Sequence, residues 1–470
     1  FVSPPPADFH LQGRVNGVSV LVLGAVVSGL ACAYELEKGG YDVTVVEARE
    51  RVGGRNLTVR RGTTVVDSRG TRQRATFARG RYFNAGPARI AAHHTTLDYC
   101  RELGVAVEPF INVNPDAYIV DGDLVRRRRS VDADLDGYIT ELLVKAVADG
   151  ALDAELTEEE AGALYDHLRA IGALAASERG YERHEGPGAG GRAGVIRDPD
   201  DLLTVLAFDL VGRRGFERNW HLSTPMFHPV GGMDAIPTAF AEALRRPVRT
   251  GSPVVEVRDG GGVRATLADG TVLEADYGVC TLPPQLSATL EGDWDDSVRT
   301  ALNEPVSVTT GKLGLEYDRR FWELDDRILG GITSTDREPR EIWYPSHDYL
   351  AVGGVVVGAY PFGPAADRFS RLRHDARTQV ATEAGVAVHG DVYRDGVVSS
   401  FSVDWRSQDF SVGGWSDFLR YGQSYDVLSA GVGRWRFAGD WLSRASGWQH
   451  GALESARLAV TGLHETALAD

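Results

Sequence analysis

Residues 18–29 read Val18-Ser19-Val20-Leu21-Val22-Leu23-Gly24-Ala25-Val26-Val27-Ser28-Gly29, an apolar run followed by a turn that contains two glycines. A helical pattern comes next, and then a second apolar run that ends at Glu47. This order predicts a strand–turn–helix–strand unit that binds a dinucleotide. Gly24 makes the tight turn, the helix N-terminus faces the pyrophosphate, and Gly29 lets helix and strand pack closely. Glu47 is placed to accept hydrogen bonds from ribose hydroxyls.

The turn departs from the usual pattern at its middle glycine, where this chain has Val26. A branched side chain there is expected to crowd the phosphates, so that the dinucleotide sits displaced or binds weakly. The glycines alone are also compatible with an ordinary βα turn that binds nothing.

The residues that follow the second apolar run favour the dinucleotide interpretation. They read Glu47-Ala48-Arg49-Glu50-Arg51-Val52-Gly53-Gly54-Arg55, and this run resembles the flavin amine oxidase superfamily. The resemblance implies that the dinucleotide is FAD rather than NAD.

Length and composition indicate a globular protein of two or three domains. The chain has 470 residues, of which 43% are hydrophobic and 25% charged, and no apolar run is long enough to span a bilayer. The net charge of −16 argues against partners such as nucleic acid or an anionic membrane. The basic run Arg126–Arg129 is interpreted as a solvated face or as the ion-pair partner of Asp132, Asp134 and Asp136.

The three cysteines, Cys32, Cys100 and Cys280, are too few for a disulfide framework. We expect Cys32 and Cys280 to be buried thiols, which favours a cytoplasmic location. The chain begins at Phe1, so removal of an export signal is also compatible with the sequence. A homodimer is expected, and no metal centre.

The predicted fold is α/β, with a discontinuous Rossmann-type FAD-binding domain and an interleaved mixed α+β substrate domain. The FAD-binding domain is predicted over residues 1–93, 224–298 and 408–470. The substrate domain is predicted over residues 94–223, mostly helical, and 299–407, strands and helices. Such interleaving usually places a ligand in the cleft between two domains.

Local patterns predict several elements within these segments. A helix is predicted over 235–244, and strands over 254–257, 263–267, 271–275, 279–282, 310–317 and 353–359. Asp269-Gly270 indicates a hairpin turn. The glycine-rich segment 186–191 is either an entrance loop or a surface loop without a role.

Five further stretches extend the resemblance across nearly the whole chain, and together they are most similar to the L-amino acid oxidase branch. They are residues 84–90, 230–232, 280–284, 312–322 and 447–454. The turn and the resemblance together assign a set of residues to the cofactor: Gly24, Val26, Ser28, Gly29, Glu47, Ala48, Arg49, Gly54, Arg55, Gly86, Pro87, Ala88, Val255, Trp415, Gly439, Asp440, Gly447 and Trp448.

Lys312 is the first candidate catalytic residue. Its spacing from Phe321-Trp322 is similar to that of the family lysine that holds a water at flavin N5, which implies a role in reoxidation of the flavin by oxygen. A lysine within the apolar strand Leu313-Gly314-Leu315 must be paired, depressed in pKa, or at a sheet edge. A solvated edge lysine is the alternative.

Arg89 and Tyr360 are the candidate substrate clamp. The resemblance places Arg89 where L-amino acid oxidases hold the substrate carboxylate, and a guanidinium matches a carboxylate with two parallel hydrogen bonds. Tyr360 is placed to add a third. The alternatives are a surface ion pair for Arg89 and a core aromatic for Tyr360.

The resemblance makes Trp448 an aromatic wall beside the flavin, against the alternative of plain interface packing. It directs backbone N–H groups at Gly447 to the pyrimidine edge, where they stabilise negative charge. Asp440 is expected near the ribityl chain or pyrophosphate. The chain has Gly413-Gly414-Trp415 where monoamine oxidases carry the flavin-bonding cysteine, which predicts noncovalent FAD.

Tyr181 and Arg327 are candidates for recognising a larger substrate at the cleft mouth. The alternatives are a packing aromatic for Tyr181 and, for Arg327, an ion pair with Glu323, Asp325 or Asp326.

The predicted reaction is oxidation of a C–N bond to an imine by hydride transfer to flavin N5, followed by reoxidation by O2 to H2O2. An L-amino acid is the expected substrate. One alternative is a tailoring oxidase, such as an oxidase-cyclase, that acts on a larger amine or amide of a biosynthetic pathway. The other is a non-catalytic protein whose flavin site has degenerated, which Val26 suggests.

Overall fold

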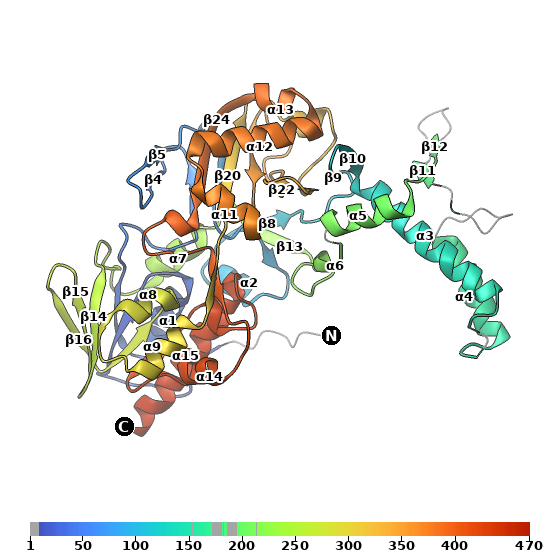
Figure 1. Ribbon diagram of the computed structural model, residues 1–470. Coiled ribbons are helices and arrows are strands. Elements are labelled where there is room, and N and C mark those ends of the chain that lie inside the picture. Colours follow the sequence, from blue (N-terminus) through green and yellow to red (C-terminus); the bar gives the residue numbers. More distant parts are fainter. Residues whose placement is uncertain (1–8, 153, 172–180, 182, 186–194, 213) are drawn as a thin grey trace.

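The computed structural model describes residues 9–470 except 153, 172–180, 182, 186–194 and 213 (Figure 1). The glycine-rich segment 186–191 therefore lies outside the described residues. Within the described part of the chain, no helix has both the length and the apolar character needed to cross a membrane.

A parallel four-stranded sheet forms around the N-terminal unit, in the order β2-β1-β17-β26. Its strands are β1 (Ser19–Leu23), β2 (Asp42–Val46), β17 (Tyr277–Cys280) and β26 (Trp435–Phe437). Parallel strands are covered on both faces, which explains why they read as continuous apolar runs. The sheet joins three segments that are far apart in the sequence.

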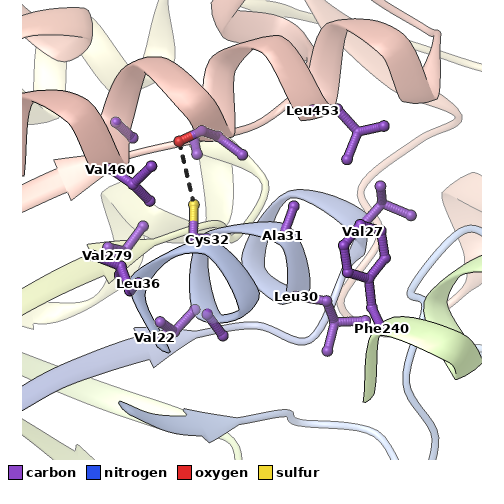
Figure 2. Packing of buried hydrophobic residues seen from close by; sticks show 14 of the residues in the cluster. Val22, Val27, Leu30, Ala31, Cys32, Leu36, Phe240, Val279, Leu453 and Val460 are labelled. Atoms are coloured by element: carbon purple, nitrogen blue, oxygen red, sulfur yellow. Dashed lines mark hydrogen bonds between the residues drawn. The ribbon is translucent and has the colours of Figure 1, made fainter. Parts of the chain in front are cut away.

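Helix α1 (Val27–Lys38) packs on the C-terminal helix α15 (Gln449–Ala469) (Figure 2). Apolar side chains of both helices, including Ala31 and Leu453, are fully buried where the helices meet. Cys32 belongs to this cluster, and its Sγ lies 3.8 Å from the carbonyl oxygen of Ala456. All three cysteines are buried, which confirms the prediction for Cys32 and Cys280, and burial raises the pKa of each thiol.

The larger sheet has seven strands in the order β10-β9-β21-β22-β23-β20-β24. They are β9 (Tyr118–Asp121), β10 (Leu124–Arg127), β20 (Gly311–Tyr317), β21 (Ile332–Thr335), β22 (Glu341–Trp343), β23 (Gly354–Ala359) and β24 (Val397–Asp404). Strand β20 lies between β23 and β24 and is buried along its whole length. Helix α12 (His374–His389) covers this part of the sheet (Figure 1).

A second four-stranded sheet lies beside the parallel sheet, far from the seven-stranded sheet (Figure 1). Its order is β16-β15-β14-β18, with β14 (Val254–Asp259), β15 (Val263–Leu267), β16 (Val272–Ala275) and β18 (Glu291–Gly292). The predicted hairpin at Asp269-Gly270 is confirmed, and Gly270 takes the φ of +83° that such a turn requires. The elements needed below are β6 (Tyr82–Asn84), β7 (Ile90–Ala91), α2 (Thr95–Glu102), α6 (Arg214–Glu217), α7 (Ala235–Ala243), α8 (Pro284–Thr289) and α10 (Phe321–Leu324).

Helices α3 (Arg128–Ala148), α4 (Glu158–Ile171) and α5 (Leu202–Gly212) form an arm that projects from the body (Figure 1). These helices lie in the segment 94–223, which was predicted to be mostly helical. Yet Ile139, Leu142 and Leu143 of α3 are 46%, 56% and 42% exposed. Helical spacing predicts which side chains share a face, but it does not say whether another element covers that face.

The interpretation of the basic run 126–129 needs correction, because its arginines pair with other acids. Arg126 contacts Asp200 at 2.7 Å and Arg128 contacts Glu217 at 2.7 Å. Asp132 and Asp136 pair instead with Arg214. Neighbours in sequence on a strand-to-helix junction point in different directions, so proximity along the chain did not identify the partners.

Candidate active site

A cavity of about 580 Å³ is lined on one side by loops and helix ends beside the parallel sheet, and on the other by the seven-stranded sheet. One wall is built from the turn before α1, residues 49–56 and residues 439–452. The other comes from β20, β22 and the residues after β23. Thirteen of the predicted cofactor residues line it: Val26, Ser28, Arg49, Gly54, Arg55, Gly86, Pro87, Ala88, Trp415, Gly439, Asp440, Gly447 and Trp448.

The N-terminus of α1 opens onto this cavity. Its N-cap residue is Val26, whose side chain makes no capping hydrogen bond, so the first backbone N–H groups of the helix are left for a ligand. The valine side chain is turned toward Gly54: a Cβ placed on Gly54 would lie 2.5 Å from Cγ1 of Val26. A glycine at position 54 therefore provides the space that a valine at position 26 needs.

A network of hydrogen bonds fixes the opposite end of this wall. Arg55 donates to Asp440 Oδ1 at 3.0 Å and to the carbonyl of Gly414 at 2.6 Å. The backbone N–H of Gly447 donates to Asp440 Oδ2 at 2.9 Å. Gly447 has φ +77°, and a Cβ there would lie 3.4 Å from the ring of Trp415. The loop before α15 is thus held against the cavity.

Five predicted cofactor residues do not line the cavity. Gly24 and Gly29 shape the turn: Gly24 has φ +99°, and a Cβ on Gly29 would lie 2.0 Å from the carbonyl oxygen of Gly24. Glu47 is buried and accepts hydrogen bonds from the backbone N–H groups of Ala25 and Arg49, each at 2.9 Å. The other two are Ala48, which follows Glu47, and Val255 on β14, whose side chain is 43% exposed.

Lys312 lies in the cavity wall on β20, with 2% of its surface exposed. Its Nζ donates to the carbonyl of Gly86 at 2.7 Å and to that of Asn84 at 3.3 Å. The ammonium lies 4.7 Å from the ring centroid of Trp343 and 4.5 Å from that of Tyr360. Burial, reinforced by Arg89, lowers the pKa of Lys312 to about 7. The alternative of a solvated edge lysine is therefore wrong.

Arg89 also faces the cavity, with its guanidinium carbon 4.8 Å from the ring centroid of Trp343 and 5.8 Å from that of Trp448. Its Nη1 donates to Asn112 Oδ1. Tyr360 lines the same cavity, and its ring meets Trp343 edge to face at 5.3 Å. The sequence-predicted pair, Arg89 and Tyr360, is thus brought to one cavity with Lys312.

Comparison with known proteins decides the family. Residues 27–464 match the family of flavin-containing amine oxidoreductases. The chain belongs to this family. It is 26% identical to the L-amino-acid oxidase of Protobothrops flavoviridis, over 96% of this chain and 89% of that protein. It is 28% identical to a putative L-amino-acid oxidase of Bacillus subtilis, over 93% of this chain and 92% of that protein.

Solved structures of similar fold are amine oxidases as well. The cyclohexylamine oxidase of Brevibacterium oxydans has a TM-score of 0.65 and 18% identity, covering 96% of this chain and 99% of that one. Putrescine oxidase bound to putrescine has a TM-score of 0.61 and 19% identity, covering 97% and 100%. The predicted α/β fold with a Rossmann-type unit is confirmed. The chain is a flavin-dependent oxidoreductase, so the non-catalytic alternative is not supported.

The residues of this amine oxidoreductase fit a flavin. Gln449, at the first position of α15, lines the cavity, and its buried Oε1 has no hydrogen-bond partner among the described residues. Such an acceptor suits a ring N–H. Helix α15 begins beside it without a side-chain cap, and the N-terminus of α1 is equally open for an anionic group.

Two predicted substrate residues lie elsewhere in the amine oxidoreductase fold. Tyr181 packs in a small cluster with Val144 and Leu168 of the arm, and its hydroxyl donates to Asp134 at 2.9 Å. Arg327 is exposed after α10, where Asp325 and Asp326 pair with Arg319 and His389. Neither residue lines the cavity. Tyr181 is a packing aromatic, and the acids near Arg327 have other partners.

Several cavity residues were missed from the sequence. Glu341 and Trp343 on β22 and the segment 216–222, which contains His221, face the cavity. Trp343 Nε1 donates to Glu341 Oε2 at 2.8 Å. Side chains alternate between the two faces of a strand, so Glu341 and Trp343 lie on the same face. This alternation was the sequence signal that could have identified them. Asn112, the partner of Arg89, carries no local signal.

Proposed function

We propose that this protein oxidises an L-amino acid to its imino acid with noncovalent FAD and releases H2O2. The observation that carries the proposal is the position of Arg89, whose guanidinium faces the cavity between the rings of Trp343 and Trp448. A guanidinium in a partly buried aromatic site is suited to a carboxylate, which it holds with two parallel hydrogen bonds. Tyr360 adds a hydroxyl to the same cavity.

FAD, when bound, accepts the hydride from the amino-acid Cα and passes the electrons to O2. The N-termini of α1 and α15, Arg49, Arg55 and Gln449 would hold it. Noncovalent binding is supported by Gly413-Gly414-Trp415 in place of a bonding cysteine and by the burial of all three cysteines away from the cavity.

Lys312 is proposed to move a proton near the reacting centre. A lysine whose pKa is about 7 changes its charge near neutral pH, which suits it to proton transfer. Its two carbonyl acceptors, on Asn84 and Gly86, hold Nζ at the wall. The rings of Trp343 and Tyr360 cover the ammonium and keep the lysine desolvated.

A second candidate is oxidation of a larger or carboxylate-free amine. Glu341 favours it, because a buried carboxylate in the cavity wall can bind a second amino group. The structural similarity to cyclohexylamine and putrescine oxidases agrees with this candidate but shows the fold alone.

Peroxide release distinguishes the candidates. The purified protein would be assayed with a panel of L-amino acids, their D-enantiomers and the corresponding decarboxylated amines. Turnover of L-amino acids alone supports the first candidate. Turnover of the decarboxylated amines at equal or higher kcat/KM contradicts it and supports the second.

A further inference from the structure

Three histidines from two distant segments meet beside the cavity. His93 and His94 lie between β7 and α2, and His221 follows α6. One ring nitrogen from each lies within 4.8 Å of the other two. His94 Nε2 is 3.0 Å from His221 Nδ1, and His93 Nε2 is 3.4 Å from the same atom. We propose that His93, His94 and His221 form a binding site for a divalent transition metal, and specifically for Zn²⁺.

Two of the three nitrogen separations are close to those of a zinc site. Zn²⁺ binds histidine nitrogens at about 2.0–2.1 Å in tetrahedral geometry, which sets the nitrogen-to-nitrogen distance at about 3.3 Å. The two shorter separations, 3.0 and 3.4 Å, lie close to this value. Binding of the ion requires the third pair of nitrogens, which lies within 4.8 Å, to close toward the same value.

Without a bound cation, the three neutral histidines cannot all form hydrogen bonds with one another. The backbone N–H of Ala91 donates to His94 Nδ1 at 3.4 Å, so a neutral His94 carries its proton on Nε2 and donates to His221 Nδ1. The single lone pair of His221 Nδ1 cannot also accept from His93. A cation at the centre would bind all three converging nitrogens.

Burial and aromatic neighbours hold the histidine rings in place. His94 is buried, and His93 and His221 are half-buried. The ring of His93 stacks on Trp220 at 4.0 Å, and that of His221 stacks on Trp448 at 5.5 Å. Binding through Nε2 moves the proton of His94 to Nδ1, which gives up the long contact with Ala91 and exchanges the hydrogen bond to His221 Nδ1 for the metal bond.

The donor set selects the class of metal. Imidazole nitrogens suit zinc, copper and nickel, whereas Mg²⁺ and Ca²⁺ prefer oxygen ligands, and the described cluster contains no carboxylate. Three protein ligands leave a fourth position for water. His221 lines the cavity, so the ion would lie at its wall and connect the segment after α6 to the start of α2.

Titration of the flavin-loaded protein with Zn²⁺ tests the site. After chelation and dialysis, calorimetry is expected to show one equivalent bound, and His93→Gln is expected to weaken binding at least about tenfold. His93 does not line the cavity, so flavin content and turnover without zinc should not change. His167→Gln, at an exposed position on α4, is the matched control and should bind like the parent.

Two results would overturn the proposal. One is the absence of binding at about 100 μM Zn²⁺, a concentration far above the dissociation constant expected of a three-histidine site. The other is equal affinity in His93→Gln and the parent. If His93→Gln fails to fold, the unmodified protein titrated with Co²⁺ decides: intense visible absorption supports the site, and the weak spectrum of hydrated cobalt contradicts it.

Discussion

Lys312 Nζ donates a hydrogen bond to the carbonyl oxygen of Gly86 at 2.7 Å, which joins β20 to the loop after β6. Gly86 in turn lies directly against Arg55, because a Cβ on Gly86 would lie 1.9 Å from the carbonyl oxygen of Arg55. Arg55 is held by Asp440. A chain of contacts thus fixes the lysine of the larger sheet relative to the cofactor wall.

Lys312→Met is expected to slow the reaction of the reduced enzyme with O2 by roughly 100-fold, the usual loss when a proton-transferring side chain is removed. In the parent, Lys312 is charged below its pKa of about 7 and neutral above it. A positive charge favours reduction of oxygen, so the rate constant for O2 should fall as pH rises through 7. Stopped-flow reoxidation over a range of pH measures both the loss in Lys312→Met and the pH dependence of the parent. If the rate constant of Lys312→Met still changes near pH 7, that pH dependence belongs to a group other than Lys312.

The same substitution is expected to stabilise the protein. The pKa of Lys312 is lowered in the folded state from 10.5 to about 7, so the unfolded chain binds more protons between these values and stability rises with pH. The cost of burying the charge is fully present below pH 7 and is relieved by pH 10.5. Lys312→Met should therefore raise Tm more at pH 6 than at pH 10. Equal shifts at both pH values would show that Lys312 is not desolvated.

Arg89→Met is expected to raise KM for an L-amino acid by roughly 30- to 1,000-fold, because loss of a charge-assisted pair costs about 2–4 kcal/mol. The effect on a decarboxylated amine should be small. Arg327→Met is the matched control, since Arg327 is exposed and outside the cavity, and its kinetics should equal those of the parent. An equal loss on both substrates in Arg89→Met would indicate a structural role for Arg89.

Gly29→Ala is expected to abolish flavin retention or folding, because the new Cβ would lie 2.0 Å from the backbone oxygen of Gly24, which cannot move away alone. Gly162→Ala on α4 is the control: a Cβ there meets nothing within 4 Å, and alanine should add about 0.5–1 kcal/mol of helix stability. Thermal unfolding and the ratio of flavin to protein absorbance measure both. Normal flavin content in Gly29→Ala would contradict the close approach.

The sequence predicted those parts of the molecule that depend on local pattern. Val263–Leu267 has the predicted bounds as β15, and Lys312 lies in the predicted strand. These predictions succeeded because alternation and turn residues act over a few positions. The domain boundaries, the homodimer and the cytoplasmic location stay predictions.

What the sequence did not reveal depends on contacts between distant segments. Asn112 binds Arg89, and His221 meets His93 and His94, through pairings that no local pattern encodes. The valine at position 26 is a related case. Its side chain faces Gly54, so the space it occupies is decided by a residue 28 positions away.

Arg89 is proposed to present an L-amino acid to a bound flavin. Anaerobic mixing of the purified yellow protein with an L-amino acid, and separately with its decarboxylated amine, tests it most directly. The proposal predicts that absorbance near ~450 nm is bleached rapidly by the amino acid and slowly or not at all by the amine. Rapid bleaching by the amine with no response to the amino acid would contradict it.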